Sequence, residues 1–199
     1  MESKYDSRMD TINHIDTVRR FMARVQSNIV DRMIKHDYSK LGTPEKEIFD
    51  EFTPKLAKST YGSVEYKSFL SAMKPALDNH YRLNSHHPEH FDIWVCPICK
   101  STFNSEEAPE ATVYEEKPRF CPKCCPQGSL FEATLEHRGI TGMSLIDVLE
   151  MLIDWKAATL RHNNGDILKS IEINQKRFGY SDDLKKILLN TVKELDFTP

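Results

Sequence analysis

Two pairs of cysteines, each with a two-residue gap, constrain the fold of this chain more than any other feature of its sequence. The pairs are Cys96-Pro-Ile-Cys99 and Cys121-Pro-Lys-Cys124. A two-residue gap lets both thiolates of one turn reach the same ion, and two such turns complete a tetrahedron. Four thiolates leave no open position on the ion, so we predict a structural zinc site. Cys125 is an alternative to Cys124 as the fourth ligand.

The cysteines belong to a segment that differs from the rest of the chain. Between residues 93 and 136, prolines, cysteines and short extended runs replace helical periodicity. We interpret this segment as an inserted zinc-ribbon-like module whose fold depends on the ion, because it has little apolar surface to bury. Residues 1–92 and 137–199 then form one helical domain. Three roles are compatible with such a module: it gates access of the substrate, docks a partner, or only adds stability.

The remainder of the chain carries helical periodicity, with apolar residues at steps of three and four. The first helix begins near Asp6 and has an apolar stripe. The helix that begins at Leu145 has Ser144 as its predicted N-cap and Asp147 at the capping-box position. It is apolar on most sides, so we predict that it is central and buried. The predicted helices span residues 6–35, 44–58, 62–84, 145–162, 166–178 and 181–195, with Pro75 as a candidate kink in the third. The sequence therefore predicts an all-α fold with one small insertion.

The length and the net charge of the chain limit the classes of function that it can have. The chain has 199 residues and a formal net charge of only -3, which counts against a nucleic-acid binder. No apolar run approaches the roughly 20 residues that span a bilayer, so we expect no membrane association. The polar N-terminus has no signal-peptide apolar region, and we predict a cytoplasmic protein. Thiols stay reduced in that compartment, which favours metal binding over disulfides.

Histidines gather in two places that suit metal binding. His36-Asp37 stands where the first helix should end, and Lys40 follows to give the pattern HDxxK. Imidazole and carboxylate can bind one divalent cation together. A denser segment runs from His80 to His90. The candidate histidine ligands are His14, His36, His80, His86 and His87.

Carboxylates on the long late helix are a second candidate group. Asp147, Glu150 and Asp154 share one helix face, because they lie three and four residues apart. Charges on a buried helix must be paired or bound to metal. The alternatives are a solvent-exposed face or neutralisation by Arg and Lys partners. Arg161, further along the same segment, could hold an anionic substrate or lie on the surface.

The order of these residues resembles the HD-domain metal-dependent phosphohydrolase superfamily, which is an all-helical bundle. The resemblance covers about three quarters of the chain, without the cysteine module. It implies metal ligands at His14, His36, Asp37 and Asp154, and its binuclear branches imply a further pair at His80 and His86 or His87. The segments NSHHPEHF and EMLIDWKAA are also similar to a phage and bacterial family of unknown function, which implies the host cytoplasm if the chain is phage-encoded.

The resemblance implies hydrolysis of a phosphomonoester or phosphodiester, with a nucleotide or cyclic nucleotide as the substrate. One or two divalent ions would activate a hydroxide, and Asp37 would bridge them. The mixed ligands suit Mn, Fe, Co, Ni or Zn. Lys40 and Arg161 would neutralise phosphoryl charge, and Glu150 would orient a ligand histidine.

Two rival hypotheses remain open. Some HD-type proteins resemble this ligand set but use two irons to oxidise C–H bonds. Alternatively, the protein is a non-enzymatic zinc-containing interaction protein, with structural histidines. An oligomer is compatible with each of these hypotheses.

Overall fold

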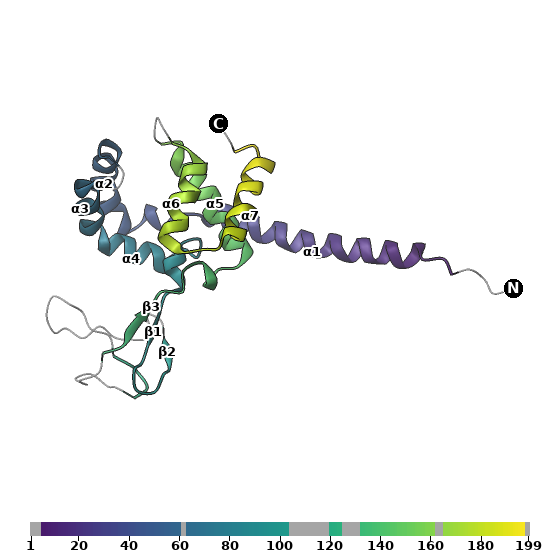
Figure 1. The fold of residues 1–199 in the computed structure, drawn as a ribbon, viewed down its shortest axis with the longest axis horizontal. Coiled ribbons are helices and arrows are strands. Elements are labelled where there is room, and N and C mark those ends of the chain that lie inside the picture. The colour runs from purple at the N-terminus through teal and green to yellow at the C-terminus, as the bar shows by residue number, and fades with distance from the viewer. Residues whose placement is uncertain (1–4, 61–62, 104–119, 125–131, 162–164, 198–199) are drawn as a thin grey trace. The chain divides into compact units, whose positions relative to one another are not determined.

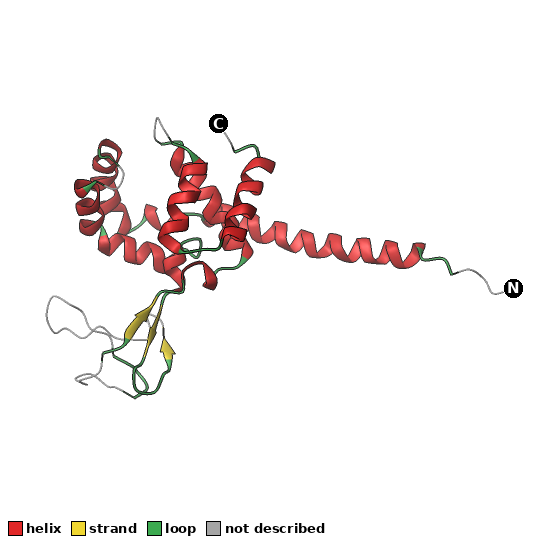
Figure 2. Ribbon diagram, in the orientation of Figure 1, coloured by secondary structure: helices red, strands yellow, loops and turns green. Residues whose placement is uncertain are grey.

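The chain is mainly helical and carries one small three-stranded sheet, as Figures 1 and 2 show. The computed structural model describes residues 5–60, 63–103, 120–124, 132–161 and 165–197. Two compact units make up the chain, Met1–Tyr38 and Ser39–Pro199. The prediction of a mainly helical fold is confirmed, while its identity as an HD-domain bundle stays a prediction. None of the described helices combines the length and the hydrophobicity needed to cross a bilayer.

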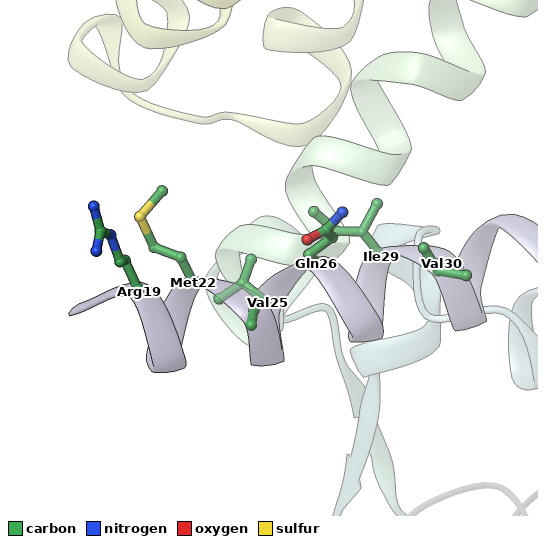
Figure 3. Close-up of a pocket in the computed structure, with 7 residues that line it drawn as sticks. Arg19, Met22, Val25, Gln26, Ile29 and Val30 are labelled. Carbon is green, nitrogen blue, oxygen red and sulfur yellow. The ribbon is translucent and has the colours of Figure 1, made fainter. Parts of the chain in front are cut away.

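The first unit contains one long helix, α1 (Arg8–Lys35). Its 28 residues span about 42 Å at 1.5 Å per residue. The predicted apolar stripe runs along it, and Figure 3 shows Met22, Val25 and Ile29 on one stretch of the helix. The helix stops at its C-cap His36, as the sequence predicts. Asp37 then adopts a left-handed backbone with φ 56°, a conformation that Asp tolerates better than most residues.

The second unit begins with three packed helices, α2 (Glu45–Lys58), α3 (Val64–Ala72) and α4 (Lys74–Leu83). The single helix predicted from residue 62 to 84 is wrong, since the structure divides it into α3 and α4. Pro75 lies in the first turn of α4, where its missing N–H leaves no helical hydrogen bond unmade. Ser63 caps α3, because its Oγ accepts a hydrogen bond from the backbone of Tyr66 at 3.1 Å.

Helices α5 (Leu145–Thr159), α6 (Ile167–Phe178) and α7 (Asp182–Glu194) pack together around the main apolar core. The prediction that α5 is central and buried holds for one side of the helix, because Val148, Met151 and Leu152 lie in the core while Leu145 is 83% exposed and Ile153 is 42% exposed. One face alone reaches the core. The buried core residues are Val148, Met151, Leu152, Ile167, Ile171, Tyr180, Leu188 and Val192.

The strands β1 (Ile93–Val95), β2 (Thr102–Phe103) and β3 (Thr134–Glu136) form an antiparallel sheet in the order β2-β1-β3. They fall within residues 93–136. Ile93 pairs with Glu136, so β1 and β3 hold the two ends of this segment together. Its small buried cluster consists of Cys96, Phe103, Cys121 and Ala133. Such a small apolar core explains why the segment needs another source of stability.

Candidate metal centres

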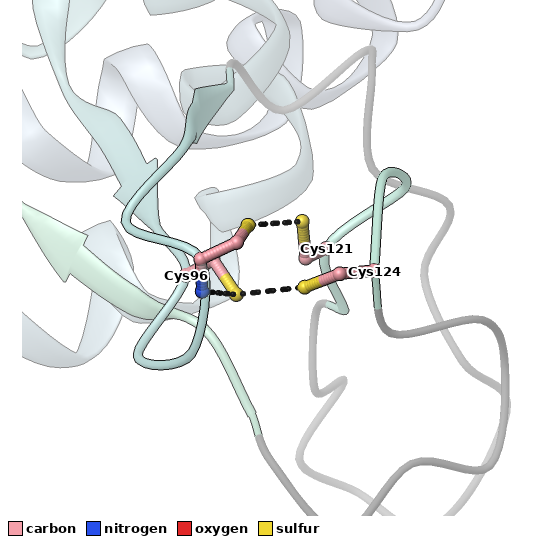
Figure 4. A group of neighbouring side chains, drawn as sticks. Cys96, Cys121 and Cys124 are labelled. Atoms are coloured by element: carbon pink, nitrogen blue, oxygen red, sulfur yellow. Dashed lines mark hydrogen bonds between the residues drawn. The ribbon is translucent and has the colours of Figure 1, made fainter.

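The four predicted zinc-binding cysteines meet at one point beside the small sheet (Figure 4). The Sγ atoms of Cys96 and Cys124 are 3.5 Å apart, and those of Cys99 and Cys121 are 3.7 Å apart. Four sulfurs at about 2.3 Å from a tetrahedral zinc are separated by about 3.8 Å. The geometry therefore fits one zinc ion. Cys125 lies outside the described residues.

Ser101 favours the thiolate form of this centre. Its Oγ is 2.7 Å from Cys99 Sγ and 3.4 Å from Cys121 Sγ. The hydrogen bond from Ser101 lowers the pKa of Cys99 to about 6, and it also lowers the pKa of Cys121. The thiolate is the form that binds metal. Ser101 therefore prepares two of the four ligands.

Three histidines of the second unit form a second centre. His80 comes from α4, while His86 and His87 lie on the loop that follows it. One ring nitrogen of each lies within 4.8 Å of the others. The Nε2 atoms of His80 and His87 are 2.9 Å apart. Two nitrogens at about 2.1 Å from one ion, at a right angle, are separated by about 3.0 Å. The cluster, His80, His86 and His87, is called the histidine cluster below.

The prediction that His80 faces inward is confirmed, since its side chain is 1% exposed. Its Nδ1 lies 2.9 Å from Oε2 of Glu45, a carboxylate that is 0% exposed. Ser39 Oγ donates to the same Glu45 oxygen at 3.0 Å. Asn79 donates to the other oxygen at 2.8 Å. His80 is thus held by a buried carboxylate from the first turn of α2.

Glu150 takes the position predicted for an orienting carboxylate. Its Oε1 lies 3.3 Å from Nδ1 of His86, which is buried. Glu150 comes from the second turn of α5, so this contact joins the histidine loop to the main core. A carboxylate on Nδ1 directs the opposite ring nitrogen toward a metal site.

His87 stays neutral across the physiological pH range. Burial, followed by the charges of His86 and His80, lowers the pKa of His87 to about 3. Asp154 acts in the opposite direction and raises this pKa, while Lys40 lowers it. Both predicted residues are therefore close enough to His87 to influence its charge. A neutral imidazole is the form that binds metal.

Polar contacts fix the loop that carries His86 and His87. Ser85 Oγ donates to Asp147 Oδ1 at 2.7 Å. The other oxygen of Asp147 accepts from the backbone of Ser144 at 2.8 Å, which completes the predicted capping box of α5. Asp147 is therefore buried and hydrogen-bonded, with a structural role. At the far end of the loop, Arg177 donates to Glu89 at 2.6 Å.

Three predicted ligands, His14, His36 and Asp37, belong to the first unit. His36 Nε2 lies 3.8 Å from Asp37 Oδ2. His14 precedes His36 by 22 residues on one continuous helix, a separation of about 33 Å. His14 and His36 of the same chain therefore cannot bind one ion, and the expectation that they do is wrong. Whether Asp37 and His36 join the histidine cluster stays a prediction.

The predicted role of Arg161 also stays a prediction. Its side chain is exposed and lies beyond the end of α5 at Thr159.

Sequence reasoning did not find Glu45 or Ser101 as parts of these centres. Glu45 stands 35 residues before His80, and no spacing rule connects the two. Ser101, two residues after Cys99, was detectable in principle as a hydroxyl next to a thiolate.

The described residues define a mainly helical protein with a four-cysteine centre and a histidine cluster backed by carboxylates. The chain belongs to a family of unknown function, DUF5662, which it matches over residues 3–112 and 130–194. The match omits residues 113–129, the segment that contains Cys121 and Cys124. Searches of curated proteins and of solved structures each found no match.

Proposed function

We propose that this protein is a metal-dependent phosphohydrolase that acts on a nucleotide or a cyclic nucleotide. The observation that carries the proposal is the histidine cluster, in which three imidazole nitrogens lie within 4.8 Å of one another. Asp154 and Lys40 both influence the charge of His87, one of these histidines. Imidazoles, a carboxylate and a cation are the groups that metal-assisted phosphoryl chemistry requires.

The ligands proposed within the second unit are His80, His86, His87 and Asp154. The sequence adds His36 and Asp37 from the first unit, and their part in the site stays a prediction.

Each side chain has a task in the proposed reaction. When bound, a divalent ion polarises a phosphoryl oxygen and makes a hydroxide available at neutral pH. His87 binds without losing a proton, because it is already neutral. Lys40, whose Nζ lies 5.3 Å from the ring centre of Phe49, would neutralise charge on the phosphoryl oxygens. Glu150 would keep the ring of His86 in its orientation.

The donor set supports a choice of ions. Nitrogen-rich sites with carboxylates favour Mn, Fe, Co, Ni or Zn over Mg. At the cysteine centre, four sulfurs leave no position for substrate, so we propose a purely structural zinc there.

The test is to measure metal content per chain and then phosphate release from a nucleotide panel with Mn²⁺. We expect one zinc at the cysteines, at least one further ion, and turnover. His87→Gln and Asp37→Ala should each lower turnover by more than about a hundredfold, since loss of residues behind the ligands already costs 10–100-fold. His90→Gln is the matched control, because the ring of His90 contacts the Tyr81 carbonyl at 3.0 Å.

Other results would replace the proposal. A single zinc per chain, with no turnover, would favour a non-enzymatic interaction protein. A coloured preparation with two irons would favour the oxygenase hypothesis.

A further inference from the structure

Glu45 is a buried carboxylate whose hydrogen-bond partners can all be assigned. It is the first residue of α2, where the helix dipole stabilises a negative charge. Its Oε1 accepts from Asn79 Nδ2 at 2.8 Å. Its Oε2 lies 3.0 Å from Ser39 Oγ and 2.9 Å from His80 Nδ1. A carboxylate accepts hydrogen bonds and donates none, so these three neighbours must be the donors.

The hydrogen bonds that the side-chain amide of Asn84 donates agree with this assignment. Asn84 Nδ2 lies 2.9 Å from Ser39 Oγ, 2.8 Å from the His80 carbonyl and 3.0 Å from His80 Nδ1. An amide carries two hydrogens, which suit the Ser39 oxygen and the His80 carbonyl. The Ser39 hydroxyl is then left to donate to Glu45. His80 Nδ1 then does not have to accept from Asn84, so it is able to donate a hydrogen to Glu45.

We propose that Glu45 is a positioning residue that fixes the Nδ1–H tautomer of His80 and makes Nε2 the metal-binding atom. The inference rests on the proposed metal site and adds a residue that acts through His80. The Nε2 atom chosen in this way is the one that lies 2.9 Å from His87 Nε2. A carboxylate bonded to the far nitrogen of a metal-binding imidazole increases its basicity and fixes its ring.

The same arrangement recurs at His86, which strengthens the inference. Glu150 Oε1 lies 3.3 Å from His86 Nδ1, as Glu45 Oε2 lies close to His80 Nδ1. Two helices, α2 and α5, thus supply one carboxylate to each of two imidazoles. A shared ion fits this repetition, because a carboxylate on Nδ1 of each ring leaves the lone pair of Nε2 available to the metal.

The first experiment measures Co²⁺ affinity of the full chain, with zinc kept at the cysteines. We expect Glu45→Gln to weaken binding about 10–100-fold and to shift the visible Co²⁺ absorption bands. Glu47→Gln is the matched control, since Glu47 lies on the same helix turn, is exposed and contacts Thr43. Zinc retention and far-UV circular dichroism report whether each variant is folded.

The second experiment needs no variant with an altered Glu45. Long-range ¹H–¹⁵N spectra of the histidine side chains in the wild-type protein identify the tautomer of His80, with His80→Gln used for assignment. We expect a hydrogen on Nδ1. A hydrogen on Nε2 alone would overturn the inference, whether or not Glu45→Gln folds.

The two proposals fail in different ways. If wild-type protein binds no Co²⁺ beyond the cysteine centre, the proposed metal site and the inference both fall. If wild-type protein binds Co²⁺ and folded Glu45→Gln binds it equally well, the role of Glu45 alone is wrong.

Discussion

His87 shows how the fold controls the charge of one side chain. Its pKa falls to about 3 because burial and the neighbouring His86 and His80 oppose a positive charge. In the unfolded chain the pKa of a histidine is about 6.5. Folding therefore keeps His87 ready to bind a cation at pH values where an exposed imidazole would begin to take up protons.

Stability should fall as the pH drops from about 6.5 toward 3. Between these pH values the unfolded chain binds a proton at His87, whereas the folded chain does not. Above about pH 6.5 both states are unprotonated at His87, so the free energy of unfolding no longer depends on this residue. The slope from His87 is at most about 1.4 kcal/mol per pH unit. The measurement is the free energy of unfolding by urea at pH 7.5, 6 and 5, without added metal. His87→Gln should lose this part of the slope; parallel curves for the two proteins would contradict the prediction.

Glu45 marks the limit of sequence reasoning at the residue scale. The sequence predicted His80 as an inward-facing ligand, because it continues an apolar helix face. It did not predict Glu45, because the contact depends on how α2 packs against α4. Helical periodicity indicates which side of a helix is buried. It does not indicate which residue of another helix contacts that side, because this depends on tertiary packing.

At the scale of elements, the continuity of α1 decides the role of His14. A rigid helix places His14 about 33 Å from His36, so it cannot share an ion with His36 in the same chain. We predict that His14→Ala leaves the metal content per chain unchanged, as measured by elemental analysis. Loss of an ion in this variant would show that His14 acts on a second copy of the chain.

The capping box of α5 has a second role that can be tested. Asp147 caps the helix and also accepts from Ser85, which precedes His86. Asp147→Asn should lower the free energy of unfolding by about 1–3 kcal/mol, because a cap and a buried charged hydrogen bond are both weakened. Ser144→Ala is the control, since it weakens the cap and keeps the contact with Ser85. Urea unfolding of both variants gives the comparison, and equal losses would refute the second role.

The small sheet should depend on zinc while the helices do not. Trp94 packs against the cluster that includes Cys96, so its fluorescence reports on this segment. In Trp155→Phe protein, a strong chelator should shift Trp94 emission to the red and leave the helical circular dichroism intact. Cys124→Ser should mimic the chelator, and Cys125→Ser should retain zinc. Unchanged emission in zinc-free protein would contradict this dependence.

At the scale of the whole molecule, the sequence predicted most helices and, in the second unit, both groups of side chains that could bind metal. Their local signals are strong: helical periodicity, caps such as Ser144, and the CPxC spacing. It misjudged α5, since an apolar composition does not show which residues other elements cover. It named Pro75 as a candidate kink, whereas the structure ends α3 at Ala72 and begins α4 at Lys74, because Pro suits a first turn as well as a kink.

The division at Tyr38 leads to a final prediction about folding. The buried apolar side chains of the described residues all lie in Ser39–Pro199: in the α5–α7 core, in the smaller cysteine cluster, and at Met73 and Ala76 at the start of α4. Hydrophobic burial is the main source of folding stability, so a chain that begins at Ser39 should fold cooperatively by itself. Circular dichroism and urea unfolding should show a single transition, with the cysteine zinc retained. The shortened chain lacks His36 and Asp37, so it should bind Co²⁺ at the histidine cluster more weakly than the full chain. Failure to fold would show that α1 contributes to the core, and unchanged Co²⁺ affinity would remove His36 and Asp37 from the proposed ligands.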